Sequence, residues 1–127
     1  MKLRIKGNSL RLRVTRPELD RLADSGRVEE SIHFAADERS KLIYALERSP
    51  DAAELTVTFN LSTIALVLPA GVVDRWRASG EAGIYATVDL GPEGALEVSI
   101  EKDFACLHGD DSGSADSFPN PDASACS

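Results

Sequence analysis

The sequence has few of the residues on which disulfide scaffolds and metal sites depend. Its 127 residues include two cysteines, Cys106 and Cys126, and two histidines. A small secreted disulfide scaffold normally has more cysteines, so we expect free thiols in a reducing compartment. Cys106 and His108 lie two positions apart, but they lack the spacing of a zinc site. We therefore expect no metal site and no cofactor.

Long apolar segments are also absent. No hydrophobic run approaches the roughly 18 residues that a membrane-spanning helix needs. Residues 1–14 alternate charged residues with Leu, Ile and Val, which is not the pattern of a signal peptide. With 43% hydrophobic and 28% charged residues, the chain has the composition of one globular domain. We expect a cytoplasmic protein without a membrane partner.

Motifs that carry catalysis are missing as well. The chain contains no G-x-S-x-G elbow, no glycine-rich phosphate loop and no grouping of a nucleophile with a base. We therefore expect that the protein is not an enzyme and has no catalytic residues.

Acidic residues are absent from the first 16 positions, although the whole chain has a formal net charge of -7. The same segment holds six of the 14 lysines and arginines, whereas the rest of the chain carries eight such residues against 21 acids. This asymmetry can create a positive surface on an acidic protein. The six cations are Lys2, Arg4, Lys6, Arg11, Arg13 and Arg16.

Alternation of charged and apolar residues predicts two strands, at 2–6 and 10–14. Gly7-Asn8-Ser9 forms the turn between them. The alternation places the cations on the solvent side of this hairpin and turns the apolar residues inward; these are Leu3, Ile5, Leu10, Leu12 and Val14.

Residues 15–26 predict a short helix, because Pro17 fits the first helical turn and Gly26 is placed to end the helix. Two further strands are expected at 28–34 and 41–47.

The same order of elements recurs after Glu54. A shift of 54 positions aligns the two halves without a gap, and seven of the 48 pairs are identical. Two strand-strand-helix-strand-strand units can close over one core. We therefore predict a mostly β (α+β) fold, a pseudo-twofold barrel built from repeats 1–48 and 54–102. The expected elements of the second repeat are strands at 55–60 and 63–69, a helix at 70–80, and strands at 82–88 and 95–101.

The segment KLRIKGNSLRLRVTRPELDRLADSGRVEESIHF, followed by KLIYALE, resembles the AbrB/MazE swapped-hairpin domain, with NLST replacing the turn in the degenerate second copy. Members of that family exchange hairpins between the two halves of a dimer and commonly bind DNA through the first strand pair. The resemblance implies that this chain contains both halves and is a monomer. The whole chain, including EKDFACL and SFPNP, is also similar to an uncharacterised family of small bacterial proteins.

We expect a non-enzymatic binding protein, a DNA-binding regulator or antitoxin-like protein whose basic hairpin contacts duplex DNA. In the alternative interpretation the cations are solvated or paired with acids such as Glu29, Glu47 and Glu101. The protein is then an interaction or structural module that binds a protein partner through its sheet surface or its tail.

The tail, residues 103–127, contains five aspartates and no lysine or arginine. Its composition predicts a largely irregular segment.

Overall fold

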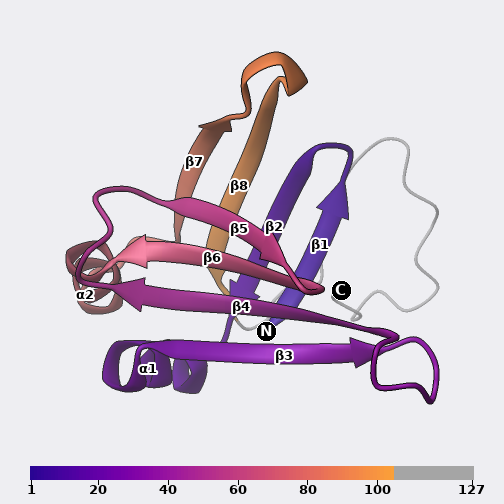
Figure 1. Cartoon of the computed structure of the whole chain (residues 1–127). Coiled ribbons are helices and arrows are strands. Elements are labelled where there is room, and N and C mark those ends of the chain that lie inside the picture. Colours follow the sequence, from indigo (N-terminus) through magenta and orange to yellow (C-terminus); the bar gives the residue numbers. More distant parts are fainter. Residues whose placement is uncertain (105–127) are drawn as a thin grey trace, which may run out of the picture.

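The computed structural model describes residues 1–104, in which each half of the chain has two strands, a helix and two further strands (Figure 1). The first half contains β1 (Lys2–Lys6), β2 (Ser9–Val14), α1 (Arg16–Ser25), β3 (Arg27–His33) and β4 (Lys41–Ser49). The second half contains β5 (Thr56–Asn60), β6 (Thr63–Pro69), α2 (Ala70–Ala78), β7 (Gly83–Asp89) and β8 (Ala95–Lys102), with a short 3-10 turn, η1 (Gly91–Glu93), between the last two strands.

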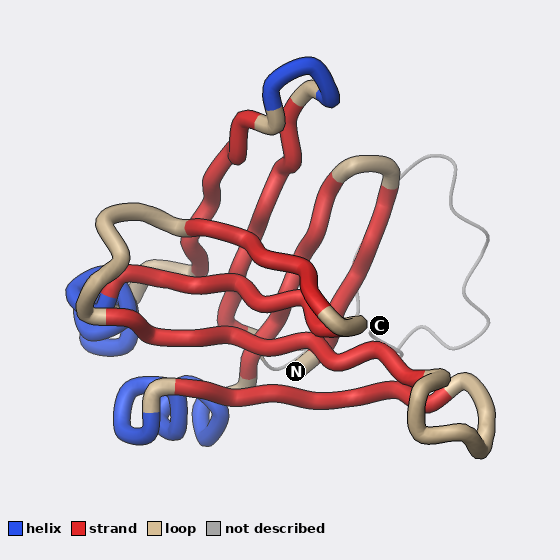
Figure 2. Tube along the Cα trace, in the orientation of Figure 1, coloured by secondary structure: helices blue, strands red, loops and turns tan. Residues whose placement is uncertain are grey.

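The strands form two four-stranded sheets, which we name sheet A (β1-β2-β8-β7) and sheet B (β3-β4-β6-β5). Figure 2 shows that strands make up most of the described chain and that both helices lie at one end of sheet B. The predicted mostly β, α+β class is therefore confirmed. The structure shows two separate sheets and does not show a closed barrel.

Each sheet combines a hairpin from the first half with a hairpin from the second half. In sheet A the two hairpins meet where β2 runs parallel to β8, and in sheet B they meet where β4 runs parallel to β6. Exchange of hairpins between halves is the arrangement that the AbrB/MazE resemblance implied.

Strand registers in the two halves are related by the 54-residue shift. Lys2 lies opposite Arg13 in the first hairpin, and Thr56 lies opposite Val67 in its counterpart. The shift fails only at the third strand of each half, because Glu47 pairs with Arg27 whereas Glu101 pairs with Gly83. The gapless alignment was therefore wrong at this strand, where the offset is 56. The second half has two more residues before β7 than the first half has before β3. Its β7–β8 connection is shorter than the β3–β4 connection, so β4 and β8 are again related by a shift of 54.

The core lies between the two sheets and is covered at one end by α1 and α2, which pack against each other. Leu22 of α1 and Trp76 of α2 occupy matching positions in the two halves, and both are buried. The hydrophobic effect of removing these side chains from water is the main stabilising contribution. Other fully buried core residues are Leu12, Val14, Leu46, Leu66, Leu68, Val73, Val98 and Ile100.

Ile5 is an exception to the burial of the apolar face of sheet A. It lies opposite Leu10, on the apolar side of sheet A, but is 58% exposed. The reason is its position, since β1 is the outermost strand of the sheet and Ile5 lies next to the turn. Ile5 therefore lies on the predicted face of the sheet, but the core does not cover it.

The start of α1 is fixed by a capping box. Thr15 accepts a hydrogen bond from the Glu18 backbone N–H, and the Glu18 carboxylate accepts one from the Thr15 N–H. Gly26 ends the helix with φ 89°, a left-handed conformation that glycine adopts without a steric penalty, as predicted. Glu18 is nearly buried and also contacts the Met1 ammonium at 2.5 Å.

Because of Glu18, the free energy of unfolding should vary with pH in the acidic range. Burial opposes its ionisation, but hydrogen bonds from the Met1 ammonium and from Thr15 lower the pKa of Glu18 below its ordinary value of 4.5. A lowered folded-state pKa stabilises the fold above the ordinary pKa, and this stabilisation disappears as the pH falls through the folded-state pKa. We expect Glu18→Gln to lower the free energy of unfolding by about 1–2 kcal/mol at pH 7.

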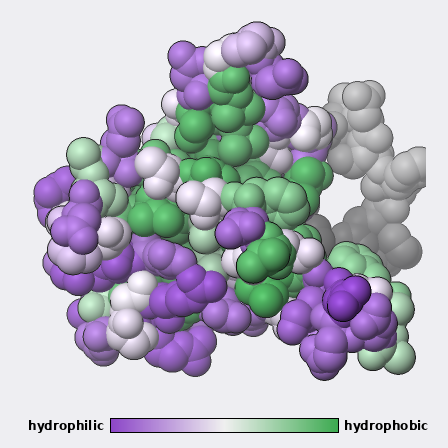
Figure 3. Space-filling model, in the orientation of Figure 1, coloured by the Kyte–Doolittle hydropathy of each residue, from purple (hydrophilic) through white to green (hydrophobic). Residues whose placement is uncertain are grey.

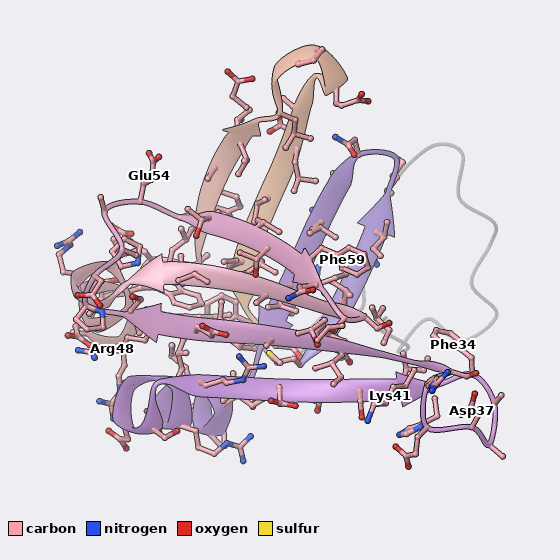
Figure 4. The ribbon with its side chains drawn as sticks, in the orientation of Figure 1. Phe34, Asp37, Lys41, Arg48, Glu54 and Phe59 are labelled. Atoms are coloured by element: carbon pink, nitrogen blue, oxygen red, sulfur yellow. The ribbon has the colours of Figure 1, made fainter. Side chains whose placement is uncertain are left out.

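Urea unfolding monitored by the fluorescence of Trp76, the single tryptophan, measures this effect between pH 7 and pH 3. The difference between the wild type and Glu18→Gln should shrink once the pH falls below about 4.5. Glu54→Gln is the matched control, because Glu54 is exposed and points away from the strands (Figure 4). A difference that is constant over the whole pH range would show that the ionisation of Glu18 contributes nothing.

Candidate nucleic-acid interface

Five of the six predicted cations lie together on the outer face of sheet A. Lys2 lies directly opposite Arg13, and Arg4 lies directly opposite Arg11. Like charges opposite one another destabilise a strand pair, so this arrangement favours a bound anion. We define the basic face as Lys2, Arg4, Lys6, Arg11 and Arg13.

A shallow hollow of about 140 Å³ opens among these cations. Its lining consists of Leu3 and four members of the basic face, namely Lys2, Arg4, Arg11 and Arg13. Convergent lysine and arginine donors around a small hollow are the chemistry that binds a phosphate group.

Acidic residues neutralise only part of the basic face. Glu101 lies 3.5 Å from Arg11 and 3.7 Å from Arg13, and Asp103 lies 3.4 Å from Lys2. Arg4 and Lys6 form no ion pair within residues 1–104. Half-exposed pairs of this kind contribute little to stability, so the charges remain available to an anionic ligand.

The acids named in the alternative interpretation have different roles. Glu101 does pair with the basic face. Glu29 and Glu47 lie in sheet B instead, where both pair with Arg27. The alternative therefore explains part of the basic face, through Glu101 and through Asp103, which pairs with Lys2.

Arg16 lies apart from the other five cations. It is exposed at the start of α1 and lines a second hollow, of about 430 Å³, together with Arg77 and Lys102. In this hollow Arg77 pairs with Asp20 at 3.0 Å, and the Lys102 ammonium donates to the Ser79 carbonyl. The structure therefore does not bring Arg16 into the basic face.

Sequence analysis missed Tyr85, which shares the outer face of sheet A with the cations. Its hydroxyl donates a hydrogen bond of 2.9 Å to Glu101, and this bond is the main reason that the pKa of Tyr85 is raised above its ordinary value. The sequence did contain a signal for Tyr85. In β7 the alternation turns Ile84, Ala86 and Val88 inward, so the aromatic side chain between them must face outward.

The model of a protein family of unknown function, DUF7009, matches residues 1–122 of the chain. The chain belongs to this family. No curated protein and no solved structure matches it. The expected similarity to an uncharacterised family is therefore confirmed, whereas the AbrB/MazE resemblance is not confirmed by any of these comparisons.

The DUF7009 match extends into the acidic tail. Cys106, His108, Cys126 and most of this tail lie outside the described residues. Within residues 1–104 no three His, Cys, Asp or Glu side chains are grouped so that they could hold a metal ion. In the same part of the chain, neither helix has the length and apolar character needed to cross a membrane.

Proposed function

We propose that this DUF7009 protein binds nucleic acid through the basic face of sheet A. In this proposal it is a non-enzymatic, DNA-binding regulator, related in architecture to a tandem AbrB/MazE swapped-hairpin domain. The exchange of hairpins within one chain supports this architecture and a monomeric state.

The hollow among Lys2, Arg4, Arg11 and Arg13 is the single observation that carries the proposal. These side chains come from two neighbouring strands and point to the same side, so they can contact successive phosphates of one backbone. Phosphate contacts supply most of the affinity of non-specific nucleic-acid binding and make it depend on salt.

Replacement of Arg11 and Arg13 by glutamate should abolish nucleic-acid binding at physiological salt and leave only weak binding at low salt. Fluorescence anisotropy with labelled duplex DNA, at low and at physiological salt, measures the effect. The wild type should bind more weakly as salt rises, because each phosphate contact releases counterions. Removal of two contacts should reduce the slope of log K against log salt by about 2.

Two further variants make this test decisive. Arg21→Glu with Arg39→Glu changes the net charge equally at exposed cations outside the basic face and should leave binding intact. Arg4→Gln with Lys6→Gln removes two cations that have no ion pair within residues 1–104, so its loss of binding cannot be ascribed to Glu101. Absence of wild-type binding at low salt, to duplex and to single-stranded DNA alike, would refute the proposal.

A second candidate function, binding of a protein partner, rests on the β5–β6 hairpin. Phe59 is 71% exposed, and Leu61 at the turn is 88% exposed with φ 51°. A bulky residue at positive φ is strained, and such strain is concentrated at functional sites. Figure 4 shows Phe59 and Phe34 at the surface, and Figure 3 shows hydrophobic surface beside β5 and on the β7–β8 hairpin.

The two functions separate experimentally. A protein partner bound through this hairpin should be lost in Phe59→Ser with Leu61→Ser and retained in Arg11→Glu with Arg13→Glu. Truncation after Lys102 tests whether the acidic tail contributes to the same interaction.

A further inference from the structure

The Tyr85 side chain lies along the outer face of sheet A. A Cβ atom added to Gly83 would lie 2.8 Å from the Tyr85 hydroxyl oxygen, so the tyrosine extends over this glycine, two positions earlier on β7. Its hydroxyl is held by Glu101 at 2.9 Å, yet the residue remains 60% exposed. The ring is therefore fixed at its hydroxyl end and accessible to solvent.

The backbone position of Tyr85 lies in line with the basic face, and its ring extends toward Gly83 and Glu101. Across the four strands of sheet A, Arg4 lies opposite Arg11, Arg11 beside Ser99, and Ser99 opposite Tyr85. Neighbouring strands are about 4.8 Å apart, so the backbone of Tyr85 is about 10 Å from that of Arg11. Ser99 lies between them, and its small side chain does not block the surface between the cations and the ring.

Glu101 connects the two parts of this surface. One carboxylate oxygen faces Arg11 and Arg13, and the other accepts the Tyr85 hydrogen bond. A single side chain thus positions two guanidinium groups and an aromatic ring on one face.

We propose that the outer face of sheet A binds single-stranded nucleic acid, with phosphates at Arg4 and Arg11 and an unpaired base stacked on Tyr85. This inference rests on the proposed function and names its substrate class. Exposed aromatic rings next to a positively charged groove are the general device for binding single strands, because every base has a π face.

Sheet geometry favours a single strand over a duplex. A two-stranded ribbon can enter the major groove of duplex DNA, but the β1–β2 hairpin is joined along β2 to β8 and forms half of a four-stranded face. Bases in a duplex are stacked on one another and cannot lie flat on such a face. A single strand exposes its bases to the ring while its phosphates remain near the cations.

Anisotropy with a labelled oligothymidine of about 12 nucleotides, compared with a duplex of the same length, tests the inference. The full chain should bind the single strand more tightly than the duplex. Tyr85→Leu should weaken single-strand binding about 5- to 150-fold, whereas Tyr85→Phe should retain it because the ring is kept. Phe59→Leu, which removes an exposed ring from sheet B, is the matched control and should bind like the wild type.

Salt dependence separates stacking from charge. Tyr85→Leu should lower the affinity without changing the salt slope, because stacking releases no counterions, whereas Arg11→Glu with Arg13→Glu should reduce the slope. Urea unfolding of each variant identifies any loss of folded protein. If binding requires the arginines but is equal in the wild type and Tyr85→Leu, the proposed function stands and the stacking inference is wrong. If no nucleic acid binds at low salt, both are wrong.

Discussion

Replacement of Trp76 by alanine is expected to lower the free energy of unfolding by about 3–5 kcal/mol. Trp76 is a buried residue of α2 and belongs to the hydrophobic core formed by the described residues. Truncation to alanine removes the largest fully buried side chain among the described residues and leaves a cavity, because the surrounding elements can move together only in part. Since small domains are stable by only about 5–15 kcal/mol, this change should remove a large part of the total.

Trp76→Phe should have a much smaller effect. The indole Nε1 is buried and has no hydrogen-bond partner among the residues that the structure describes. Phenylalanine removes this unpaired donor, which offsets part of the lost packing. Urea unfolding followed by far-UV circular dichroism compares the variants without relying on tryptophan fluorescence. A loss in Trp76→Phe as large as that in Trp76→Ala would show that the indole N–H is paired in solution.

Replacement of Leu12 or Leu66 by alanine should cost about 2–5 kcal/mol each. These leucines are related by the 54-residue shift, lie on the central strands β2 and β6, and are fully buried. Because their surroundings correspond, we expect similar losses from the two variants. Fluorescence of the buried Trp76 during urea unfolding measures both.

Ile5→Ala is the control for this pair. Ile5 lies on the same face of sheet A as Leu12 but is largely exposed, so its truncation should cost less than about 1 kcal/mol. If Leu66→Ala were as mild as Ile5→Ala, the correspondence between the two sheets would not hold in solution.

Most of the local structure could be predicted from the sequence, because its cause is local. Strict alternation identified β1 and β2, and Gly26 correctly marked the end of α1. The division of the strands into two sheets has a different origin. The pairing of Ser9 with Glu97 joins residues that are far apart in the sequence, so it cannot be predicted from the short-range alternation of residues. Only the resemblance to swapped-hairpin domains suggested such an exchange.

The candidate site was predicted in part for the same reason. Alternation placed Arg4 and Arg11 on one face correctly, since both belong to a single hairpin. Tyr85 belongs to the other half of the chain, and its position in line with these arginines depends on the β2–β8 pairing. Arg16 was grouped with the hairpin by proximity in sequence, but the start of α1 turns the chain away from sheet A.

The position of β8 also determines when the protein can fold during its synthesis. The β1–β2 hairpin is synthesised before the other strands of the described chain, but its neighbour in sheet A is the last of those strands. Until β8 emerges, the edge of β2 and the buried face of the first hairpin have no partner, and the same hairpin cannot complete a core with its own half. Folding of the two sheets should therefore wait until β8 has been synthesised and should be slow for a domain of this size, because the central contacts are so distant in sequence.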